Sequence, residues 1–298
     1  MAANHAGVPP VLGIIGGSGI YDIEGLSDVR WEAVNSPYGA PSDELMFGKL
    51  GDQQIVFLPR HGRGHRVPPS ELNFRANIDV LKRAGVTEIL SLSAVGSLRE
   101  DLAPGTFVIV DQFIDRTFAR VKSFFETGLV AHVSMADPVC GRLGDEIAEA
   151  ADEVGINLVR GGTYLVMEGP QFSSLAESRL YRQWGCDVIG MTGMPEAKLA
   201  REAELPYATL AMVTDYDCWR EEEEAVSVTN VLEIMGQNSA LARQAVVRLA
   251  TELADTPRTA SPDGIETCLD YALITAPTAR DPALLEKLQV IAGRALGG

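Results

Sequence analysis

The sequence contains few of the residues that build metal, disulfide or redox sites. Among its 298 residues there are four cysteines and four histidines. The cysteines are Cys140, Cys186, Cys218 and Cys268, and no two of them have the CxxC spacing of a zinc or thiol-redox motif. We therefore expect reduced, buried thiols and a cytoplasmic protein, with no metal and no other cofactor.

Positive charge is also scarce. The chain has 25 Lys and Arg against 41 Asp and Glu, a formal net charge of −16. Such a protein repels the phosphates of nucleic acids and of anionic membranes, so we expect neither as a partner. No apolar run approaches the ~18 residues that a membrane-spanning helix needs. Residues 1–10 lack the basic start of a signal peptide, and we expect them to be a flexible lead-in.

The rest of the chain has the composition of a globular protein, with 46% hydrophobic residues. Short β-branched runs alternate with segments of helical periodicity, which predicts an α/β fold with a largely parallel sheet and helices on both faces. We expect one domain over residues 11–298, ending in a weaker helical segment at about 255–298. The predicted strands are 11–17, 54–59, 88–97, 106–115, 162–169, 187–193 and 207–217. The predicted helices are 73–85, 141–155, 175–185, 195–205 and 226–254.

Polar and flexible residues gather where these predicted strands end. The carboxyl ends of parallel strands meet at one edge of a sheet, so we expect a single composite pocket there. The segments concerned are 16–19 (GGSG), 60–66 (RHGRGHR), 91–97 (SLSAVGS), 168–170 (EGP), 191–193 (MTG) and 215–217 (DYD).

The strongest single signal is segment 60–66, which holds three arginines and two of the four histidines in a very acidic chain. The planar donors of Arg60, Arg63 and Arg66 suit phosphate or carboxylate, although a solvated basic loop is the alternative. The glycine turn at 16–19 is not GxGxxG, and it either holds an anion or is an ordinary tight turn. The hydroxyls of segment 91–97 and Thr192 fit an anion site or a packing patch equally well.

Asp215 and Asp217 stand at alternate positions, so both carboxyls lie on the same side of an extended segment. In such a pair one carboxyl keeps its proton to higher pH, as a general acid requires. The alternative is a surface loop or a helix cap. An anion pocket next to a carboxylate pair suits the transfer of a group to or from phosphate.

Six segments together resemble the trimeric purine nucleoside phosphorylase superfamily. They are IIGGSGIYDIEGL, LPRHGRGHRVPPSELNFRANI, LSAVGSLREDLAPGTFVIVDQFIDRT, MEGPQFSSLAES, VIGMTGMPEAKLA and MVTDYDCW. They are collinear from about residue 11 to about residue 250, and the last ~45 residues match poorly. The resemblance implies a homotrimer with a mixed, largely parallel central sheet flanked by helices. It also implies phosphorolysis, closest to that of S-methyl-5'-thioadenosine, with phosphate as co-substrate.

The resemblance also implies a role for each site residue. Phosphate would be bound by Ser18, Arg60, His61, Ser93, the backbone of Ala94, and Thr192. Met191 would contact the ribose, and Asp215 and Asp217 would meet the N7 and 6-amino edge of adenine. Phe172 and Ser173 would line the base pocket. Val228, together with His132 of a neighbouring subunit, would border the methylthio group.

The aspartate pair bears on specificity, because a 6-oxo purine has no hydrogen to donate to a carboxylate at that edge. Relatives that act on 6-oxopurines carry Asn and small residues at positions 215–217, so we expect an amino-purine substrate. Ser93 departs from the Thr usual in animal enzymes but keeps the hydroxyl. A broader or 6-oxopurine phosphorylase is the alternative, and a non-catalytic nucleoside-binding protein is a further one.

Overall fold

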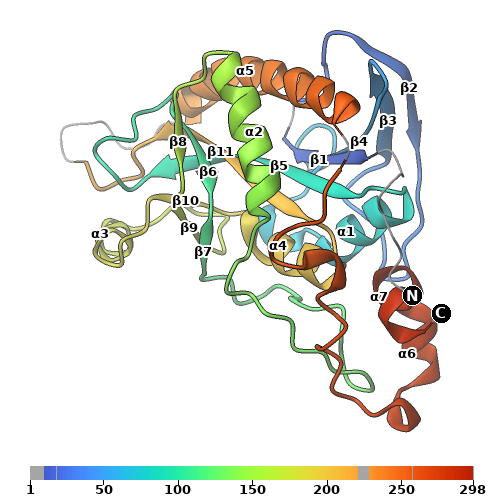
Figure 1. Cartoon of the computed structure of the whole chain (residues 1–298). Coiled ribbons are helices and arrows are strands. Elements are labelled where there is room, and N and C mark those ends of the chain that lie inside the picture. The colour runs from blue at the N-terminus through green and yellow to red at the C-terminus, as the bar shows by residue number, and fades with distance from the viewer. Residues whose placement is uncertain (1–9, 18, 221–227, 257, 298) are drawn as a thin grey trace.

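An eleven-stranded mixed sheet runs through the molecule, with helices packed on both of its faces (Figure 1). This computed structural model describes residues 10–17, 19–220, 228–256 and 258–297. The predicted fold class, a mixed and largely parallel sheet flanked by helices, is confirmed. None of the described helices is both long and apolar enough to cross a membrane.

The strand order is β2-β3-β4-β1-β5-β10-β9-β7, and a branch of β11, β6 and β8 leaves the sheet at β5. The pairs β1–β4, β1–β5 and β5–β11 are parallel. The pairs β2–β3, β3–β4, β5–β10 and β6–β11 are antiparallel. The strands are β1 Val11–Gly16, β2 Leu26–Glu32, β3 Leu45–Leu50, β4 Gln53–Pro59, β5 Glu88–Ser97, β6 Phe107–Val110, β7 Gln112–Asp115, β8 Leu158–Arg160, β9 Thr163–Val166, β10 Val188–Gly190 and β11 Tyr207–Asp215.

Three strands, β2, β3 and β8, were not predicted, and the single predicted strand 106–115 is divided into β6 and β7. β2 is mostly exposed and polar, and β8 has three residues, so neither carries a buried apolar run. The predicted strand 106–115 divides at Asp111, whose backbone N–H and carboxylate both bond to Gly162. On either side of this point β6 pairs with β11 and β8, while β7 pairs with β9.

Two apolar layers hold the helices against the sheet. Successive residues of a strand point to opposite faces, so Ile15 packs into one layer and Ile14 into the other. The first layer takes residues from α1, α4 and α7, and the second from α2 and α5. The helices are α1 Phe74–Arg83, α2 Gly141–Glu153, α3 Leu175–Gln183, α4 Gly193–Glu202, α5 Val228–Asp255, α6 Pro282–Lys287 and α7 Gln289–Leu296.

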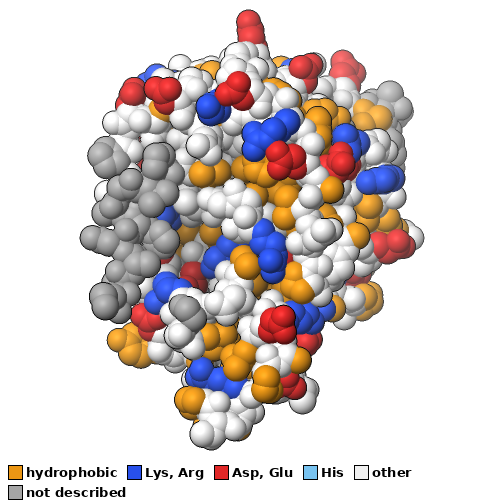
Figure 2. Space-filling model, turned by 90° about the vertical axis from the view of Figure 1, so that its right-hand side faces the viewer, with side chains coloured by type: hydrophobic (Ala, Val, Ile, Leu, Met, Phe, Trp, Pro, Cys, Tyr) orange, Lys and Arg blue, Asp and Glu red, His pale blue; other side chains and the backbone are white. Residues whose placement is uncertain are grey.

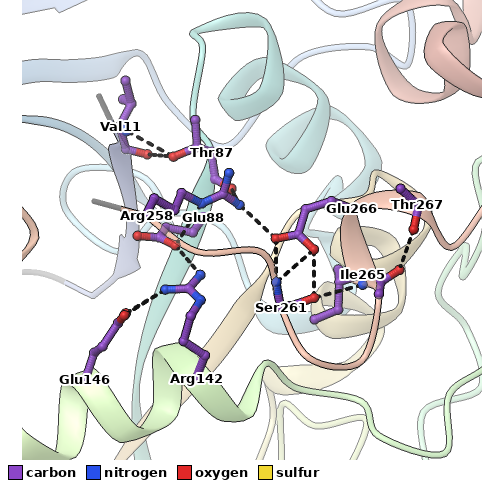
Figure 3. Close-up of polar contacts among 11 residues, drawn as sticks. Val11, Thr87, Glu88, Arg142, Glu146, Arg258, Ser261, Ile265, Glu266 and Thr267 are labelled. Atoms are coloured by element: carbon purple, nitrogen blue, oxygen red, sulfur yellow. Dashed lines mark hydrogen bonds and ion pairs between the residues drawn. The ribbon is translucent and has the colours of Figure 1, made fainter. Parts of the chain in front are cut away.

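The segment that follows α5 is tied to the start of the central strand β5 by buried charges (Figure 3). The carboxylate of Glu88, fully buried, accepts from Arg142 at 2.7 Å and from Arg258 at 3.4 Å. Arg258 also pairs with Glu266, at 3.2 Å, and Glu266 in turn accepts from the Ser261 hydroxyl. The chain beyond α5 is thus fixed to the interior through its charged side chains.

On the surface, the excess of acidic residues does not form one continuous patch on the face drawn in Figure 2. Acidic and basic side chains are interspersed there, with hydrophobic side chains between them. On this face, acidic and basic side chains are thus mixed rather than separated into patches of one sign.

The pairing of β5 leaves a gap in the middle of the sheet. Along one edge, β1 pairs with residues 88–91 of β5 and β10 with residues 96–97. Between them, within the described part of the chain, residues 92–95 have no strand partner on that edge. These residues form one wall of the cavity described next.

Candidate active site

A cavity of about 240 Å³ opens where β1, β4, β5, β10 and β11 end, and it collects most of the predicted site residues. Nine of them line it: Arg60, His61, Ser93, Ala94, Phe172, Met191, Thr192, Asp215 and Asp217. Much of the remaining wall is apolar and was not predicted: Ile20, Leu92, Val95, Met167, Ile189, Met212 and Met235. Five of the six segments expected to form one composite pocket contribute residues to this cavity, and segment 168–170 does not.

Four predicted site residues are not among these. Ser18 lies outside the described residues, and Val228 begins α5 with a side chain that also lies outside them. Ser173 is buried beside the cavity, where its hydroxyl donates to the sulfur of Met167 at 3.7 Å. His132 is exposed and does not line this cavity within its own chain. The roles of all four remain predictions.

The guanidinium of Arg60 is buried and almost fully occupied by the protein. Its Nε and Nη2 donate to the two carboxylate oxygens of Glu196 at 2.9 and 3.0 Å, and Nη2 also donates to Ser91 at 2.7 Å. Nη1 donates to the Leu92 carbonyl at 2.8 Å, which leaves one Nη1–H for a ligand. Burial lowers the pKa of Arg60, but the carboxylate of Glu196 outweighs it and the net shift is upward.

The other two arginines of the RHGRGHR segment do not reach the cavity. Arg63 pairs with Asp43 at 2.7 Å and with Glu44 at 2.8 Å. Arg66 is exposed, 3.7 Å from Asp43. For Arg63 and Arg66 the alternative of a basic surface loop therefore agrees better with the structure, because nearby carboxylates pair with both side chains.

His61 is held as a neutral ring. Its Nδ1 lies 2.9 Å from the carbonyl of Val67, which accepts only if Nδ1 carries the proton. Burial, followed by the charge of Arg60, lowers the pKa of His61 to about 4. The ring stacks on His65 with centroids 4.3 Å apart. Nε2 is therefore left as a hydrogen-bond acceptor at neutral pH.

Two hydroxyls meet between the ends of β5 and β10. Ser93 Oγ lies 2.8 Å from Thr192 Oγ1 and 3.1 Å from the hydroxyl of Tyr164. Ser93 and Thr192 are both buried, although they come from segments 99 residues apart. Their hydroxyl protons can rotate toward a ligand, so this pair suits an anion.

The two aspartates differ in how completely they are bonded. Asp215 accepts from the backbone N–H of Asp217 at 2.8 Å and from the hydroxyl of Thr214 at 2.7 Å. Asp217 is held at φ 53°, and its Oδ2 is buried without a hydrogen-bond partner among the described residues. Burial above all, and the nearby charge of Asp215, raise the pKa of Asp217 against the lowering effect of Ser178. The carboxyl of Asp217 therefore ionises less readily than that of an exposed aspartate.

Glu196, Thr214 and Ser239 are polar residues at this site that sequence reasoning missed. Glu196 lies three residues after the predicted MTG segment and was assigned to a helix start, where acidic residues are common. Its position in the first turn of α4, after a proline and close in sequence to Thr192, could have indicated a place at the site, whereas its residue type could not. Within the described part of the chain, no group of three or more His, Cys, Asp or Glu side chains is placed to hold a metal.

This fold and pocket are those of a nucleoside phosphorylase: the family model of the phosphorylase superfamily matches residues 11–253. An S-methyl-5'-thioadenosine phosphorylase from Rhodospirillum rubrum is 62% identical over 288 residues, covering 97% of this chain and 98% of that protein. The crystal structure of a methylthioadenosine phosphorylase from an antarctic soil metagenomic library superposes with a TM-score of 0.89. It is 45% identical and covers 95% of this chain and 99% of that one.

A mutant of the adenosine/methylthioadenosine phosphorylase from Schistosoma mansoni, in complex with methylthioadenosine, is 37% identical. Its TM-score is 0.77, and the match covers 83% of this chain and 93% of that one. The chain belongs to the S-methyl-5'-thioadenosine phosphorylase family.

The comparisons also bear on the C-terminal segment. The superfamily model ends at residue 253, in agreement with the poor match expected for the last ~45 residues. The Rhodospirillum rubrum protein, however, aligns over 288 residues, more than the first 253 can supply. The segment after α5 is thus shared with that relative although the superfamily model does not include it.

Proposed function

We propose that this enzyme cleaves the N-glycosidic bond of S-methyl-5'-thioadenosine with phosphate, giving adenine and 5-methylthioribose 1-phosphate. One observation carries the proposal: hydroxyls, Arg60 and neutral His61 line the same cavity as Asp215 and Asp217, and the two sets are spread along the sheet, since Ser93 pairs with Ala211 and Gly96 with Asp215. This is the arrangement that a nucleoside needs when phosphate attacks C1' and a purine leaves. Full-length relatives named for this reaction support it.

At the phosphate end, the free Nη1–H of Arg60 and the hydroxyls of Ser93 and Thr192 donate to phosphate oxygens. The backbone of Ala94 and Ser18 complete this set in our proposal. Nε2 of neutral His61 can only accept a hydrogen bond, so it accepts one from the single P–OH group of the phosphate dianion. The other phosphate oxygens carry the negative charge. This charge stabilises the oxocarbenium-like transition state, and one of these oxygens attacks C1'.

At the base end, adenine is a poor leaving group as an anion and needs a proton at N7. A carboxyl pair that shares one proton meets this need: one member donates to N7 and the other accepts from the 6-amino group. The raised pKa of Asp217 favours retention of one proton by the pair, and in our proposal this proton lies on Asp215 when Asp217 accepts from the 6-amino group. We assign N7 to Asp215 and the 6-amino edge to Asp217. Phe172 and Ser173 flank the base, and Met191 contacts the ribose.

We also propose a homotrimer, in which His132 of a neighbouring subunit and Val228 border the methylthio group. His132 is exposed, and its backbone lies beside the segment that carries Tyr271 and Ile274, with exposed fractions of 98% and 62%. The segment that carries His132 pairs with the segment that carries Ile274, since the Ile274 N–H donates to the Val130 carbonyl at 2.9 Å. A second copy would cover these apolar side chains.

Two organisational features belong to the same proposal. Residues 11–298 act as one domain, which the buried ion pairs between β5 and the segment after α5 support. The protein works in the cytoplasm, and its four free cysteines are consistent with a reducing compartment.

The proposal is tested by release of adenine from S-methyl-5'-thioadenosine with and without phosphate. We expect release only with phosphate, together with a sugar 1-phosphate. Equal release in phosphate-free buffer would make the enzyme a hydrolase. Specificity constants for S-methyl-5'-thioadenosine, adenosine and inosine then separate the proposal from a 6-oxopurine phosphorylase, which would prefer inosine. Tight nucleoside binding without turnover would indicate a non-catalytic protein.

A further inference from the structure

Arg120 lies in the segment after β7, and its guanidinium is buried directly behind the cavity wall. Its side chain is 1% exposed and lies against the ring of Phe74, 5.2 Å from the ring centroid. It is not one of the lining residues, so it does not touch the space that a substrate would fill. Neither the sequence motifs nor the proposed function assigns it a role.

The guanidinium joins the ends of two strands through backbone carbonyls. Nη1 donates to the carbonyls of Met191 at 2.8 Å and Met194 at 2.6 Å. Nη2 donates to the carbonyls of Glu168 at 2.8 Å and Met167 at 3.4 Å. Met167 and Glu168 follow β9, and Met191 follows β10. One side chain thus fixes the relative position of both loops at the cavity floor.

The two carbonyls on Nη1 enclose Thr192, whose hydroxyl bonds Ser93 on the cavity side. Arg120 holds this turn from behind, while Ser93 holds it from the front. Because Thr192 and Met191 are the proposed contacts for phosphate and ribose, a small shift of the turn would misplace both ligands. Displacements of ~1 Å at such positions are costly in rate.

The charge of Arg120 is balanced on the side away from the cavity. Its Nε donates to Oε1 of Glu168 at 3.2 Å, and Oε2 of Glu168 accepts the backbone N–H groups of Phe118 and Ala119 at 2.7 and 3.1 Å. All five N–H donors of Arg120 therefore have acceptors. A lysine at this position has three donors and no planar fork, so it cannot reproduce the set.

We propose that Arg120 is a positioning residue that sets the Met191–Thr192 turn for phosphate and ribose. The inference rests on the proposed function, since it concerns the same site. It adds a residue outside the cavity on which the phosphate affinity of the enzyme depends.

The test compares Arg120→Ala with Arg116→Ala. Arg116 is an exposed arginine of the same segment, whose side chain lies over the ring of Trp184, away from the carbonyls that Arg120 holds. We expect Arg120→Ala to raise KM for phosphate ~10-fold or more and to lower kcat, with Arg116→Ala within about twofold of the wild type. Millimolar guanidinium chloride should restore part of the phosphate affinity of Arg120→Ala and leave Arg116→Ala unchanged.

A purely structural role would lower the active fraction without changing KM, and guanidinium would not help; that result overturns the proposal. If Arg120→Ala does not fold, Arg120→Lys keeps the charge opposite Glu168, and a KM for phosphate within twofold of the wild type would overturn it equally. The two proposals fail in different ways. A wild-type enzyme without phosphate-dependent turnover refutes the function, whereas an active wild type with unchanged Arg120 variants refutes only the positioning role.

Discussion

The two ends of the cavity are built differently. At the phosphate end, Arg60 and Thr192 are 2% and 8% exposed, and all of their side-chain donors except one Nη1–H of Arg60 already have protein partners. At the base end, Phe172 is 55% exposed, and Asp217 has a buried oxygen without a partner among the described residues. The described phosphate end is thus mostly held in place by bonds within the protein, whereas the base end keeps a buried carboxylate oxygen open for a ligand.

The origin of the difference lies in the elements that form each end. The phosphate end joins β4, β5 and the start of α4, and Glu196 cross-links them by accepting from Arg60, Ser91 and the hydroxyl of Tyr207. The base end combines the last residue of β11 with a loop that carries Phe172. A rigid phosphate site serves any nucleoside, so discrimination between nucleosides falls to the less constrained end.

The largest expected effect comes from breaking the phosphate end with Glu196→Gln. The buried guanidinium of Arg60 would lose its counter-charge, and breaking a buried pair costs about 3–5 kcal/mol. We expect kcat/KM for phosphate to fall by about 100-fold or more and the free energy of unfolding to drop, measured by steady-state kinetics and denaturant titration. Glu44→Gln, which removes an exposed partner of Arg63, is the matched control and should change either quantity little. An unchanged KM for phosphate would show that Glu196 is not needed there.

A smaller effect on activity, with the opposite sign for stability, is expected from Asp217→Asn. Asn tolerates the φ of 53° at this position, so the backbone is kept. The folded-state pKa of Asp217 is raised, so its stabilising contribution is complete below the unfolded pKa and is lost as pH rises through the folded pKa. Asparagine avoids this loss.

We therefore expect Asp217→Asn to melt above the wild type at pH 8, by a margin that shrinks as the pH falls toward about 4, the ordinary pKa of an aspartate. Turnover of S-methyl-5'-thioadenosine should fall by about 10- to 100-fold, with the phosphate KM unchanged. Thermal unfolding at the two pH values and steady-state kinetics measure these effects. A melting difference independent of pH would rule out a raised pKa at Asp217.

The smallest effect is expected from Phe172→Ala, which removes the exposed ring at the base end. An exposed aromatic contributes stacking of about 1–1.5 kcal/mol or less, so KM for the nucleoside should rise only several-fold. KM for phosphate and thermal stability should stay within error of the wild type. A comparable rise in both KM values would mean that the two ends are not independent and would remove the distinction drawn above.

The strand ends were predictable because buried β-branched runs and the residues that follow them are local signals. The strands β1, β4, β5 and β11 therefore agree closely with prediction, and the site residues that follow them line one cavity. The polar strand β2 and the three-residue strand β8 depend on partners distant in sequence, so no local pattern marks them. The fork of Arg60 was predicted to face phosphate, yet its Nε and Nη2 donate to Glu196, 136 residues away. The pairing of a given arginine with a given carboxylate depends on tertiary packing, so it could not be predicted from local sequence patterns.

The ion pairs around Glu88 have a practical meaning for anyone who shortens or fuses the chain. A protein cut between α5 and Arg258 would leave Glu88 inside the molecule with Arg142 as its remaining basic partner in the network of Figure 3. That carboxylate stands at the start of the strand that carries Ser93 and Ala94. A fragment that ends with the superfamily match at residue 253 would therefore be a poor expression target. We expect the loss of the Arg258 pair to disturb the cavity too, because residues further along the same strand line it.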